Sequence, residues 1–468
     1  MNSTYTKIEK RHAEAFADIC GNANVLVAGA IPDHYGRDYT EDLKFDPEVV
    51  VKPGSTEEVS RILAFCNKEN IPVTPRGAGT GLSGGALPVY GGVVLSTERL
   101  NKIIDIDTAN LQATVQPGVI NQVFRDAVEA QGLFYPPDPA SRGSCFLGGN
   151  LAECAGGPKA VKYGVTRDYV LNTEIVLPSG EIMMTGANVL KNSTGYNLTQ
   201  LLIGSEGTLG VITKIIFRLL PKPKHDLLLL VPFASSEAAC AAVSAVFRSG
   251  IIPSAMEFME RDALDYAMQF VETTLQVADN VAAHLIIEVD GNDQDALFRD
   301  CEKITEVVTE FGCLDVLFAD SAAQKAELWK LRRAVGEAVK AHSIYKEEDT
   351  VVPRAALPEL LKGVKETGRK YGFRTVCYGH AGDGNLHVNI LRDEMSETDW
   401  NTHVPEGIRE IFKLCVQLGG TLSGEHGIGY VQKNYMDIPF GPAAIALQKG
   451  IKKVFDPNNI LNPSKMFP

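Results

Sequence analysis

The chain has 468 residues, 45% of them hydrophobic and 22% charged, which is typical of a globular protein with two or three domains. Its 45 basic and 58 acidic residues give a formal net charge of −13 at pH 7, which argues against a nucleic-acid-binding surface and against strong attraction to anionic lipid. An anionic small substrate would therefore need a local positive pocket.

The first residues contain no apolar segment of the kind found in secretory signals, and no apolar run approaches the length of a membrane span. We therefore expect a cytoplasmic protein without a membrane span. The nine cysteines are scattered and form no C-x-x-C pair, so neither a disulfide framework nor an iron–sulfur cluster is expected within this chain. Most of them are expected to be small buried side chains.

The N-terminal half begins with a predicted β-α-β unit. Hydrophobic patterning predicts a helix over 9–20 and strands over 49–53 and 71–74, and Ser55 is a predicted N-cap for the helix between these strands, which extends to about residue 67. The second strand leads directly into a glycine-rich loop. Further elements follow in chain order: strands 92–97, 103–107 and 112–116, helix 120–131, a second glycine-rich tract 143–164, and strands near 174–178 and 210–219.

Alternate prolines in the segment 221–224 indicate a linker. Beyond it, strands alternate with long helices, which predicts a separate α+β domain with a mostly antiparallel sheet. Its expected strands are 226–232 and 283–290, and its expected helices are 237–249, 293–311 and 322–340. The tail from residue 406 is predicted to be a helix, a glycine-rich turn and a second helix.

The loop after the β-α-β unit contains Gly79-Thr80-Gly81-Leu82-Ser83-Gly84, which matches the dinucleotide-binding pattern G-x-G-x-x-G. An NAD-binding fingerprint needs a helix directly after its glycines, whereas here the strand-like segment 93–96 follows with no room for a helix. The loop is therefore expected to bind a phosphate through its own backbone N–H groups. The loop still fits a dinucleotide ligand, but its context argues against NAD.

Two short glycine-rich motifs, "YGHAGDGNLHVNI" at 378–390 and "GEHGIG" at 424–429, contain three of the nine histidines. A tight turn over 381–385 would bring His380 beside His387 on the next strand. With Glu425, these imidazoles form an N/N/O set suited to a divalent metal such as Zn, Mn or Fe, with open positions for substrate. The alternative is that they are hydrogen-bonded turn histidines. Asp383 is expected to stabilise the turn and not to bind the metal.

A predicted helix contains Trp329-Lys330-Leu331-Arg332-Arg333, and Lys346 follows it. Cationic side chains of this kind usually form a solvated helix face. If the substrate carries a carboxylate, however, one guanidinium and one ammonium group would form a natural clamp for it.

These residues resemble the FAD-linked D-2-hydroxyacid dehydrogenases, a family that includes D-lactate dehydrogenases, the large subunit of glycolate oxidase and D-2-hydroxyglutarate dehydrogenase. The resemblance spans nearly the whole chain in the right order, and the motifs that carry it are "TPRGAGTGLSGGALP", "GGNLAECAGGPKAVKYGVTRDYV", "GSEGTLGVIT", the two histidine motifs and "FDPNNILNP". It implies an α+β fold with a two-lobed FAD-binding domain of the vanillyl-alcohol-oxidase type over 1–220. A cap domain with an antiparallel sheet over 221–410 and a C-terminal helical segment over 411–468 would complete it.

The resemblance implies a set of FAD-binding residues. They lie in the first glycine loop, along the second glycine tract, at the next strand and in the tail: Pro75, Arg76, Gly77, Ala78, Gly79, Thr80, Gly81, Ser83, Gly84, Ser141, Gly148, Asn150, Gly157, Gly164, Glu206, Gly210, Ile212 and Asn462. Relatives that bind FAD covalently often carry a histidine in or beside this loop, and "RGAGTGLSGG" offers none. We therefore expect non-covalent FAD.

By the same resemblance, His380, His387 and Glu425 are the expected metal ligands and His426 is the expected catalytic base. Arg332, Lys346 and Asn389 are the expected substrate contacts. The hydroxyglutarate enzymes have a threonine four positions after the clamp arginine, whereas Gly336 stands here, with one residue fewer before the lysine. This difference weakens the case for a dicarboxylate substrate.

The implied activity is the metal-assisted oxidation of a D-2-hydroxy acid, with D-lactate as the expected substrate, to the 2-oxo acid by hydride transfer to flavin N5. The expected electron acceptor is another protein, an electron-transfer flavoprotein or an iron–sulfur subunit. Alternatives within the family are a glycolate oxidase subunit and a D-2-hydroxyglutarate dehydrogenase. More distant alternatives are an alkyl-glycerone-phosphate synthase, a metallohydrolase that uses the His/His/Glu set, and a non-catalytic FAD-binding subunit.

Overall fold

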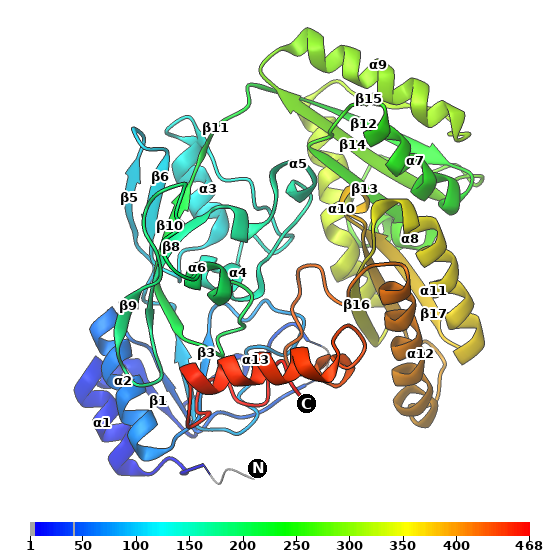
Figure 1. Cartoon of the computed structure of the whole chain (residues 1–468). Coiled ribbons are helices and arrows are strands. Elements are labelled where there is room, and N and C mark those ends of the chain that lie inside the picture. The colour runs from blue at the N-terminus through cyan, green and yellow to red at the C-terminus, as the bar shows by residue number, and fades with distance from the viewer. Residues whose placement is uncertain (1–4, 41–42) are drawn as a thin grey trace. The chain divides into compact units, whose positions relative to one another are not determined.

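A computed structural model describes residues 5–40 and 43–468 (Figure 1). Its internal contacts divide the chain into two compact units. Unit 1 combines the described residues of Met1–Ala155 with Val165–Lys222 and Glu425–Pro468, and unit 2 combines Gly156–Gly164 with Pro223–Gly424. The second unit thus takes a nine-residue segment from within the second glycine tract, which the sequence patterns did not indicate.

The first sheet of unit 1 has the strand order β1-β2-β4-β3, in which β4 pairs in parallel with both β2 and β3. Valines 49–51 are completely buried in β2, and the Ser55 hydroxyl accepts a hydrogen bond from the Glu58 N–H at the start of α2, as predicted for an N-cap. The expected β-α-β unit is therefore confirmed. The elements are α1 (Lys10–Cys20), β1 (Val25–Val27), β2 (Val49–Val51), α2 (Thr56–Glu69), β3 (Val73–Arg76) and β4 (Val93–Ser96).

The second sheet of unit 1 is antiparallel throughout, with the strand order β5-β6-β10-β8-β9. A small additional pair joins β7 to β11, so Pro221, expected in the linker, belongs to a short strand with Leu220. Proline is tolerated there because a strand end does not need its N–H group. The elements are β5 (Ile103–Asp107), β6 (Gln112–Val115), α3 (Asn121–Glu129), β7 (Leu133–Phe134), α4 (Leu147–Glu153), β8 (Val170–Val176), β9 (Ile182–Met184), α6 (Leu198–Leu202), β10 (Val211–Arg218) and β11 (Leu220–Pro221).

Unit 2 is built on a seven-stranded sheet with the order β15-β12-β14-β13-β17-β18-β16. Every pair in it is antiparallel, as predicted. Its strands are β12 (His225–Phe233), β13 (Ala255–Glu260), β14 (Ala283–Gly291), β15 (Leu317–Ala319), β16 (Tyr345–Val351), β17 (Arg374–Gly379) and β18 (Asn385–Leu391).

Helices cover both faces of this sheet (Figure 1). The helices α8 (Arg261–Phe270) and α10 (Ala322–His342) pack together and share one hydrophobic core with the sheet. On the other side α7 contacts α9 and α11, and α11 contacts α12. The bounds of these helices and of the short α5 are α5 (Ala160–Tyr163), α7 (Ser236–Arg248), α9 (Gln294–Glu310), α11 (Leu357–Tyr371) and α12 (Glu397–Gln417).

The last helix of unit 2, α12, differs from the prediction that it starts at residue 406. It begins at Glu397, where the Ser396 hydroxyl accepts from the Asp399 N–H, and it continues through Pro405. Proline usually ends a helix because it cannot donate the backbone hydrogen bond, which explains the misplaced start. Unit 1 ends with α13 (Pro442–Phe455). Within residues 5–40 and 43–468, no helix combines the length and the apolar character needed to cross a bilayer.

Candidate functional site

In unit 1, β3 ends at Pro75 and Arg76 and leads straight into the glycine loop. The loop residues 77–92 contain no helix before β4 begins, as the sequence context predicted. Gly79 and Gly84 both adopt a φ of +75°, a left-handed conformation that a side chain would strain. Consecutive backbone N–H groups in such a loop form a concavity suited to an anion.

Buried polar groups face this loop without protein partners. The Arg76 side chain is 4% exposed, and its guanidinium lies 5.8 Å from the centroid of the Tyr35 ring. Neither Arg76 Nη1 nor Ser83 Oγ has a hydrogen-bond partner among the described residues. A Cβ at Gly81 would meet nothing within 4 Å. Buried donors without partners beside open space fit the anionic pyrophosphate of a dinucleotide.

The C-terminal tail returns to the glycine loop within unit 1. The Asn462 amide Nδ2 donates to the carbonyl oxygens of Gly85, at 3.0 Å, and Glu206, at 2.7 Å. The buried Lys465 Nζ donates to the Leu87 carbonyl at 2.7 Å, and burial lowers the pKa of this lysine to about 7. Lys465 was not among the predicted site residues.

Within unit 1, Glu206, between α6 and β10, contacts the "GEHGIG" turn. Its carboxylate accepts hydrogen bonds from the backbone N–H groups of Ile428, at 2.7 Å, and Gly429, at 2.6 Å. Burial raises the pKa of Glu206 to about 7, and burial together with the charge of Glu206 raises the pKa of Glu153 well above its ordinary value. The predicted cofactor contact Glu206 therefore uses its carboxylate to hold the turn that follows His426.

The other predicted FAD-binding residues are distributed over both units. Ser141 lies in the loop before α4, and Gly148 and Asn150 lie on α4. Gly210 directly precedes β10 and Ile212 belongs to it, packed in a cluster with Ile175. Gly157 and Gly164 lie in the segment that belongs to unit 2.

In unit 2, a tight turn brings two of the predicted metal ligands together. His380 follows β17, a short turn covers residues 381–383, and His387 lies on β18. The two ring centroids are 5.3 Å apart with the planes at 81°. The predicted proximity of these histidines is confirmed. Asn389, completely buried, follows on the same face of β18.

One buried carboxylate contacts both a histidine and the predicted clamp arginine. Glu257 on β13 is completely buried, and its two oxygens lie 2.9 Å from His380 Nδ1. The Arg332 Nη2 atom lies 2.7 Å from the same carboxylate. Because an ionised carboxylate only accepts hydrogen bonds, this contact favours a proton on His380 Nδ1, and in a neutral imidazole Nε2 is then the unprotonated nitrogen. Sequence reasoning missed Glu257, although an acid inside the apolar strand 255–259 was a usable signal.

Arg332, on α10, is held on two sides. Its guanidinium lies 5.0 Å from the Tyr378 ring centroid, in addition to its contact with Glu257. Arg332 Nε is buried and has no hydrogen-bond partner in the described part of the chain. A donor of this kind fits an incoming carboxylate.

Two further acids lie near His387. Asp349 Oδ1 and Glu347 Oε1 are 3.5 Å and 3.7 Å from His387 Nδ1. Asp349 also accepts from the Asn385 amide, at 2.7 Å, and from the backbone N–H of Gly424, at 2.8 Å. This carboxylate therefore fixes both the strand that carries His387 and the end of the segment that precedes Glu425.

Lys346 is separated from these groups by the strand itself. In the register of β16 with β18, Glu347 pairs with Asn389 and Asp349 with His387, so Lys346 lies on the opposite face, with its Nζ 6.0 Å from the Trp400 ring centroid. The structure therefore brings together His380, His387, Asn389 and Arg332 but not Lys346. Glu425 and His426 belong to unit 1, as its first residues after the chain leaves unit 2.

Two family models match the chain. One, described as an FAD binding domain, matches residues 47–186, and the other, described as FAD linked oxidases, C-terminal domain, matches residues 222–466. The chain belongs to the FAD-linked oxidases. The matches support FAD as the cofactor, in agreement with the unpartnered donors around the glycine loop.

This FAD-linked oxidase is similar over nearly its whole length to named relatives. It is 40% identical to D-lactate dehydrogenase of Anaerostipes hadrus, with 99% of this chain and 98% of the relative covered. It is also 40% identical to glycolate oxidase subunit GlcD of Bacillus subtilis, with 98% and 97% covered, and 36% identical to D-2-hydroxyglutarate dehydrogenase of Xanthomonas citri pv. viticola, with 93% and 92% covered. The resemblance to the FAD-linked D-2-hydroxyacid dehydrogenases is confirmed.

Solved structures support the fold of this FAD-linked oxidase. p-Cresol methylhydroxylase matches with a TM-score of 0.80 at 19% identity, covering 97% of this chain and 96% of that one. Alkyldihydroxyacetonephosphate synthase matches with a TM-score of 0.76 at 18% identity, covering 99% and 86%. At these identities the likeness concerns the fold alone, and it confirms the expected α+β fold with an FAD-binding domain of the vanillyl-alcohol-oxidase type.

Proposed function

We propose that the protein is an FAD-dependent, metal-assisted dehydrogenase that oxidises a D-2-hydroxy acid, with D-lactate as the expected substrate, to the 2-oxo acid. The observation that carries the proposal is the grouping of His380, His387 and Arg332 on one face of the unit 2 sheet. Two imidazoles suit a divalent cation, and a buried guanidinium suits a carboxylate, so the three groups together match a 2-hydroxy acid. The names of the relatives at 36–40% identity agree with this substrate class.

In the proposed reaction the substrate loses a hydride from C2 and a proton from its hydroxyl. When bound, FAD supplies the hydride acceptor, and a divalent cation, Zn, Mn or Fe, supplies a Lewis acid that lowers the pKa of the substrate hydroxyl. His380, His387 and Glu425 are the proposed ligands of that cation. Within unit 2, the residue before Glu425, Gly424, donates its N–H to the Asp349 carboxylate.

The protein's own side chains would orient the substrate and move the proton. Arg332 binds the carboxylate through donors that include Nε, and Asn389 is a proposed neighbour of the substrate. His426 is the proposed acceptor of the hydroxyl proton, because imidazole is the side chain best suited to proton transfer near neutral pH. The Glu206 carboxylate binds the N–H groups of Ile428 and Gly429, close after His426 in the chain. These hydrogen bonds fix the backbone of the turn that carries the proposed base.

The proposal favours a small monocarboxylate over 2-hydroxyglutarate. A second substrate carboxylate would need a second cation on the face that carries His387. The strand β16 offers Glu347 on that face, whereas Lys346 lies on the other. A substrate carboxylate placed beside Glu347 would therefore meet like charge.

Anaerobic mixing of the FAD-loaded protein with D- and L-2-hydroxy acids tests the proposed function. D-Lactate is expected to bleach the visible band of the oxidised flavin fastest, with glycolate and D-2-hydroxyglutarate slower and the L-acids inactive. Failure of every D-acid in the panel to bleach the flavin would contradict the proposed reaction. Reoxidation by an electron-transfer flavoprotein, compared with an iron–sulfur subunit, tests the proposed protein acceptor.

Replacing the proposed base tests its role separately. His426→Ala is expected to retain FAD and to slow single-turnover flavin reduction by roughly 10² to 10⁴, the contribution typical of general-base catalysis. Stopped-flow absorbance measures the rate, and the ratio of flavin to protein absorbance checks cofactor content. A reduction rate equal to that of the wild type would remove His426 from this role.

A further inference from the structure

In unit 2, the carboxylate of Glu257 contacts both His380 and Arg332. It lies on β13, whereas His380 follows β17 and Arg332 lies on α10, so three separate elements meet at one side chain. The carboxylate is completely buried, and Arg332 is 5% exposed. Water therefore cannot easily replace either contact.

Each contact has a distinct chemical consequence. Both Glu257 oxygens lie within hydrogen-bond distance of His380 Nδ1, which fixes the ring orientation and keeps the proton on that nitrogen. The negative charge also balances the buried guanidinium of Arg332, whose other side lies against Tyr378. Without this carboxylate, a buried cation would lose its partner and the imidazole could adopt the other tautomer.

We propose that Glu257 is a positioning residue that sets the tautomer of His380 and the orientation of Arg332, so that metal binding and binding of the substrate carboxylate depend on one buried side chain. The inference rests on the proposed function for the roles of His380 and Arg332. The geometry of Glu257 itself does not depend on it. A carboxylate bound to the far nitrogen of a metal-ligating histidine commonly raises metal affinity by 10- to 100-fold.

Glu257→Gln is the direct test, because the amide keeps the size of the side chain and removes its charge. The affinity for Zn²⁺ or Mn²⁺, measured by competition with a chelator and by elemental analysis after dialysis, is expected to fall roughly 10- to 100-fold. At saturating metal, KM for D-lactate is expected to rise several-fold because Arg332 is no longer held. Unchanged metal affinity in this variant would overturn the proposal.

Glu260→Gln is a matched control on the same strand. Glu260 is also buried, at 6% exposed, and accepts from Lys365, at 2.7 Å, and from the backbone N–H of Cys377, so it forms a comparable ion pair elsewhere in the unit. This variant is expected to lose stability but to keep the metal affinity of the wild type. An equal loss of metal affinity in both variants would assign the effect to general destabilisation and would overturn the proposal.

A spectroscopic readout separates this inference from the proposed function. In metal-free protein with ¹⁵N-labelled histidine, His380 is expected to have a protonated Nδ1 and an unprotonated Nε2. Glu257→Gln is expected to give a mixture of tautomers, because the glutamine amide can either accept from Nδ1–H or donate to an unprotonated Nδ1. If the wild type binds no metal but the tautomer depends on Glu257, the proposed function fails together with the predicted effect on metal affinity, and only the control of the His380 tautomer by Glu257 stands. If the wild type binds metal and the tautomer is unchanged in Glu257→Gln, the positioning role fails alone.

A shorter carboxylate covers the case in which Glu257→Gln does not fold. Glu257→Asp keeps the negative charge, but its side chain is one methylene shorter, so the carboxylate lies farther from His380 and Arg332. It is expected to retain the Nδ1-protonated tautomer and to bind metal with an affinity between those of the wild type and a carboxylate-free site. Wild-type metal affinity together with a changed tautomer would contradict the proposal.

Discussion

At the scale of single residues, burial decides which titratable groups can couple pH to stability. His284 on β14 is 3% exposed, and burial followed by the charge of Arg261 lowers its pKa to about 4. The ordinary pKa of histidine is about 6.5, so between pH 6.5 and pH 4 the unfolded chain binds a proton that the folded unit does not. Folding of unit 2 is therefore expected to lose stability as the pH falls through this window.

His284→Gln tests this coupling. Between pH 7 and pH 5 the wild-type histidine is expected to contribute a loss of about 2 kcal/mol in the free energy of unfolding, and the glutamine variant should lack it. Both tryptophans of the chain, Trp329 and Trp400, lie in unit 2, so their fluorescence during urea unfolding reports on this unit. His403→Gln, a change at a half-exposed position, is the control and should behave like the wild type. An identical pH dependence in all three proteins would contradict the prediction.

At the scale of elements, the turn between β17 and β18 sets the spacing of the two histidines. Gly384 has a φ of +78°, and a Cβ there would collide with the Val352 carbonyl oxygen. Glycine is required for both reasons, since a side chain would be strained and would also push the turn away from its neighbour. The distance between His380 and His387 therefore depends on this position.

Gly384→Ala is expected to lower both the stability of unit 2 and its metal affinity. The left-handed conformation alone costs an alanine about 1–2 kcal/mol, and the collision adds to this. Gly372→Ala is the matched control, because Gly372 has a φ of +79° but open space around its missing Cβ. Urea unfolding should find a larger loss of stability in Gly384→Ala than in Gly372→Ala. Chelator competition should find a loss of metal affinity in Gly384→Ala alone. Equal losses of stability in both variants would show that the collision with the Val352 carbonyl contributes nothing beyond the left-handed backbone conformation.

The sequence predicted these local elements better than their partners across the fold. The turn at 381–385, the cap at Ser55 and the helix-free glycine loop depend on neighbouring residues, and each was predicted correctly. Glu257 was missed because its contact with His380 joins residues 123 positions apart. Lys346 was predicted as a substrate contact from its charge and from the family resemblance, neither of which indicates which face of β16 carries it. In the register of β16 with β18 it lies on the face opposite Glu347.

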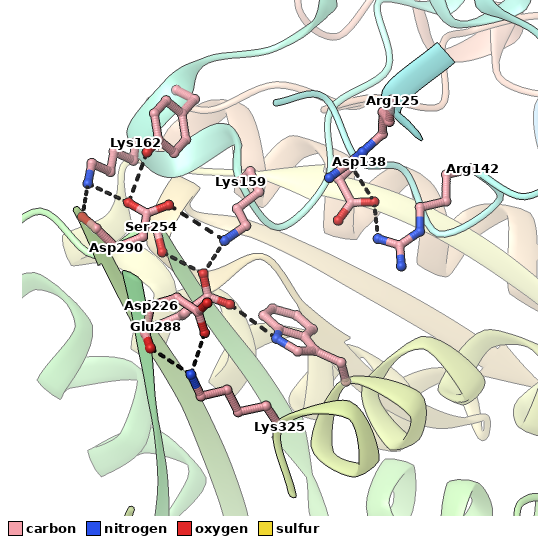
Figure 2. Close-up of polar contacts among 12 residues, drawn as sticks. Arg125, Asp138, Arg142, Lys159, Lys162, Asp226, Ser254, Glu288, Asp290 and Lys325 are labelled. Atoms are coloured by element: carbon pink, nitrogen blue, oxygen red, sulfur yellow. Dashed lines mark hydrogen bonds and ion pairs between the residues drawn. The ribbon is translucent and has the colours of Figure 1, made fainter. Parts of the chain in front are cut away.

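At the scale of the whole molecule, the segment 156–164 makes unit 2 discontinuous in sequence. Lys159 pairs with Glu288, and Lys162 and Tyr163 donate to the Asp290 carboxylate, at 2.6 Å and 2.9 Å (Figure 2). Ser254 and Trp329 also donate to Glu288. These ion pairs hold the segment that contains the proposed FAD contacts Gly157 and Gly164 on the antiparallel sheet.

Lys159→Met is expected to destabilise unit 2 by about 3–5 kcal/mol, because it leaves a buried carboxylate without its cation. Lys325→Met is the control, since Lys325 pairs with the half-exposed Asp226 at 2.6 Å and such surface pairs contribute about 1 kcal/mol or less (Figure 2). Tryptophan fluorescence during urea unfolding compares the two variants. Similar small losses in both would indicate that the Lys159 pair contributes little to folding.

The return of the tail to the glycine loop has a consequence for biosynthesis. Asn462 closes on the carbonyl of Gly85, a residue made 377 positions earlier on the ribosome. The nascent N-terminal lobe therefore lacks part of its phosphate cradle while translation continues. We therefore expect stable flavin loading to follow completion of the chain, and a truncation that removes Asn462 to lower FAD content before it affects turnover.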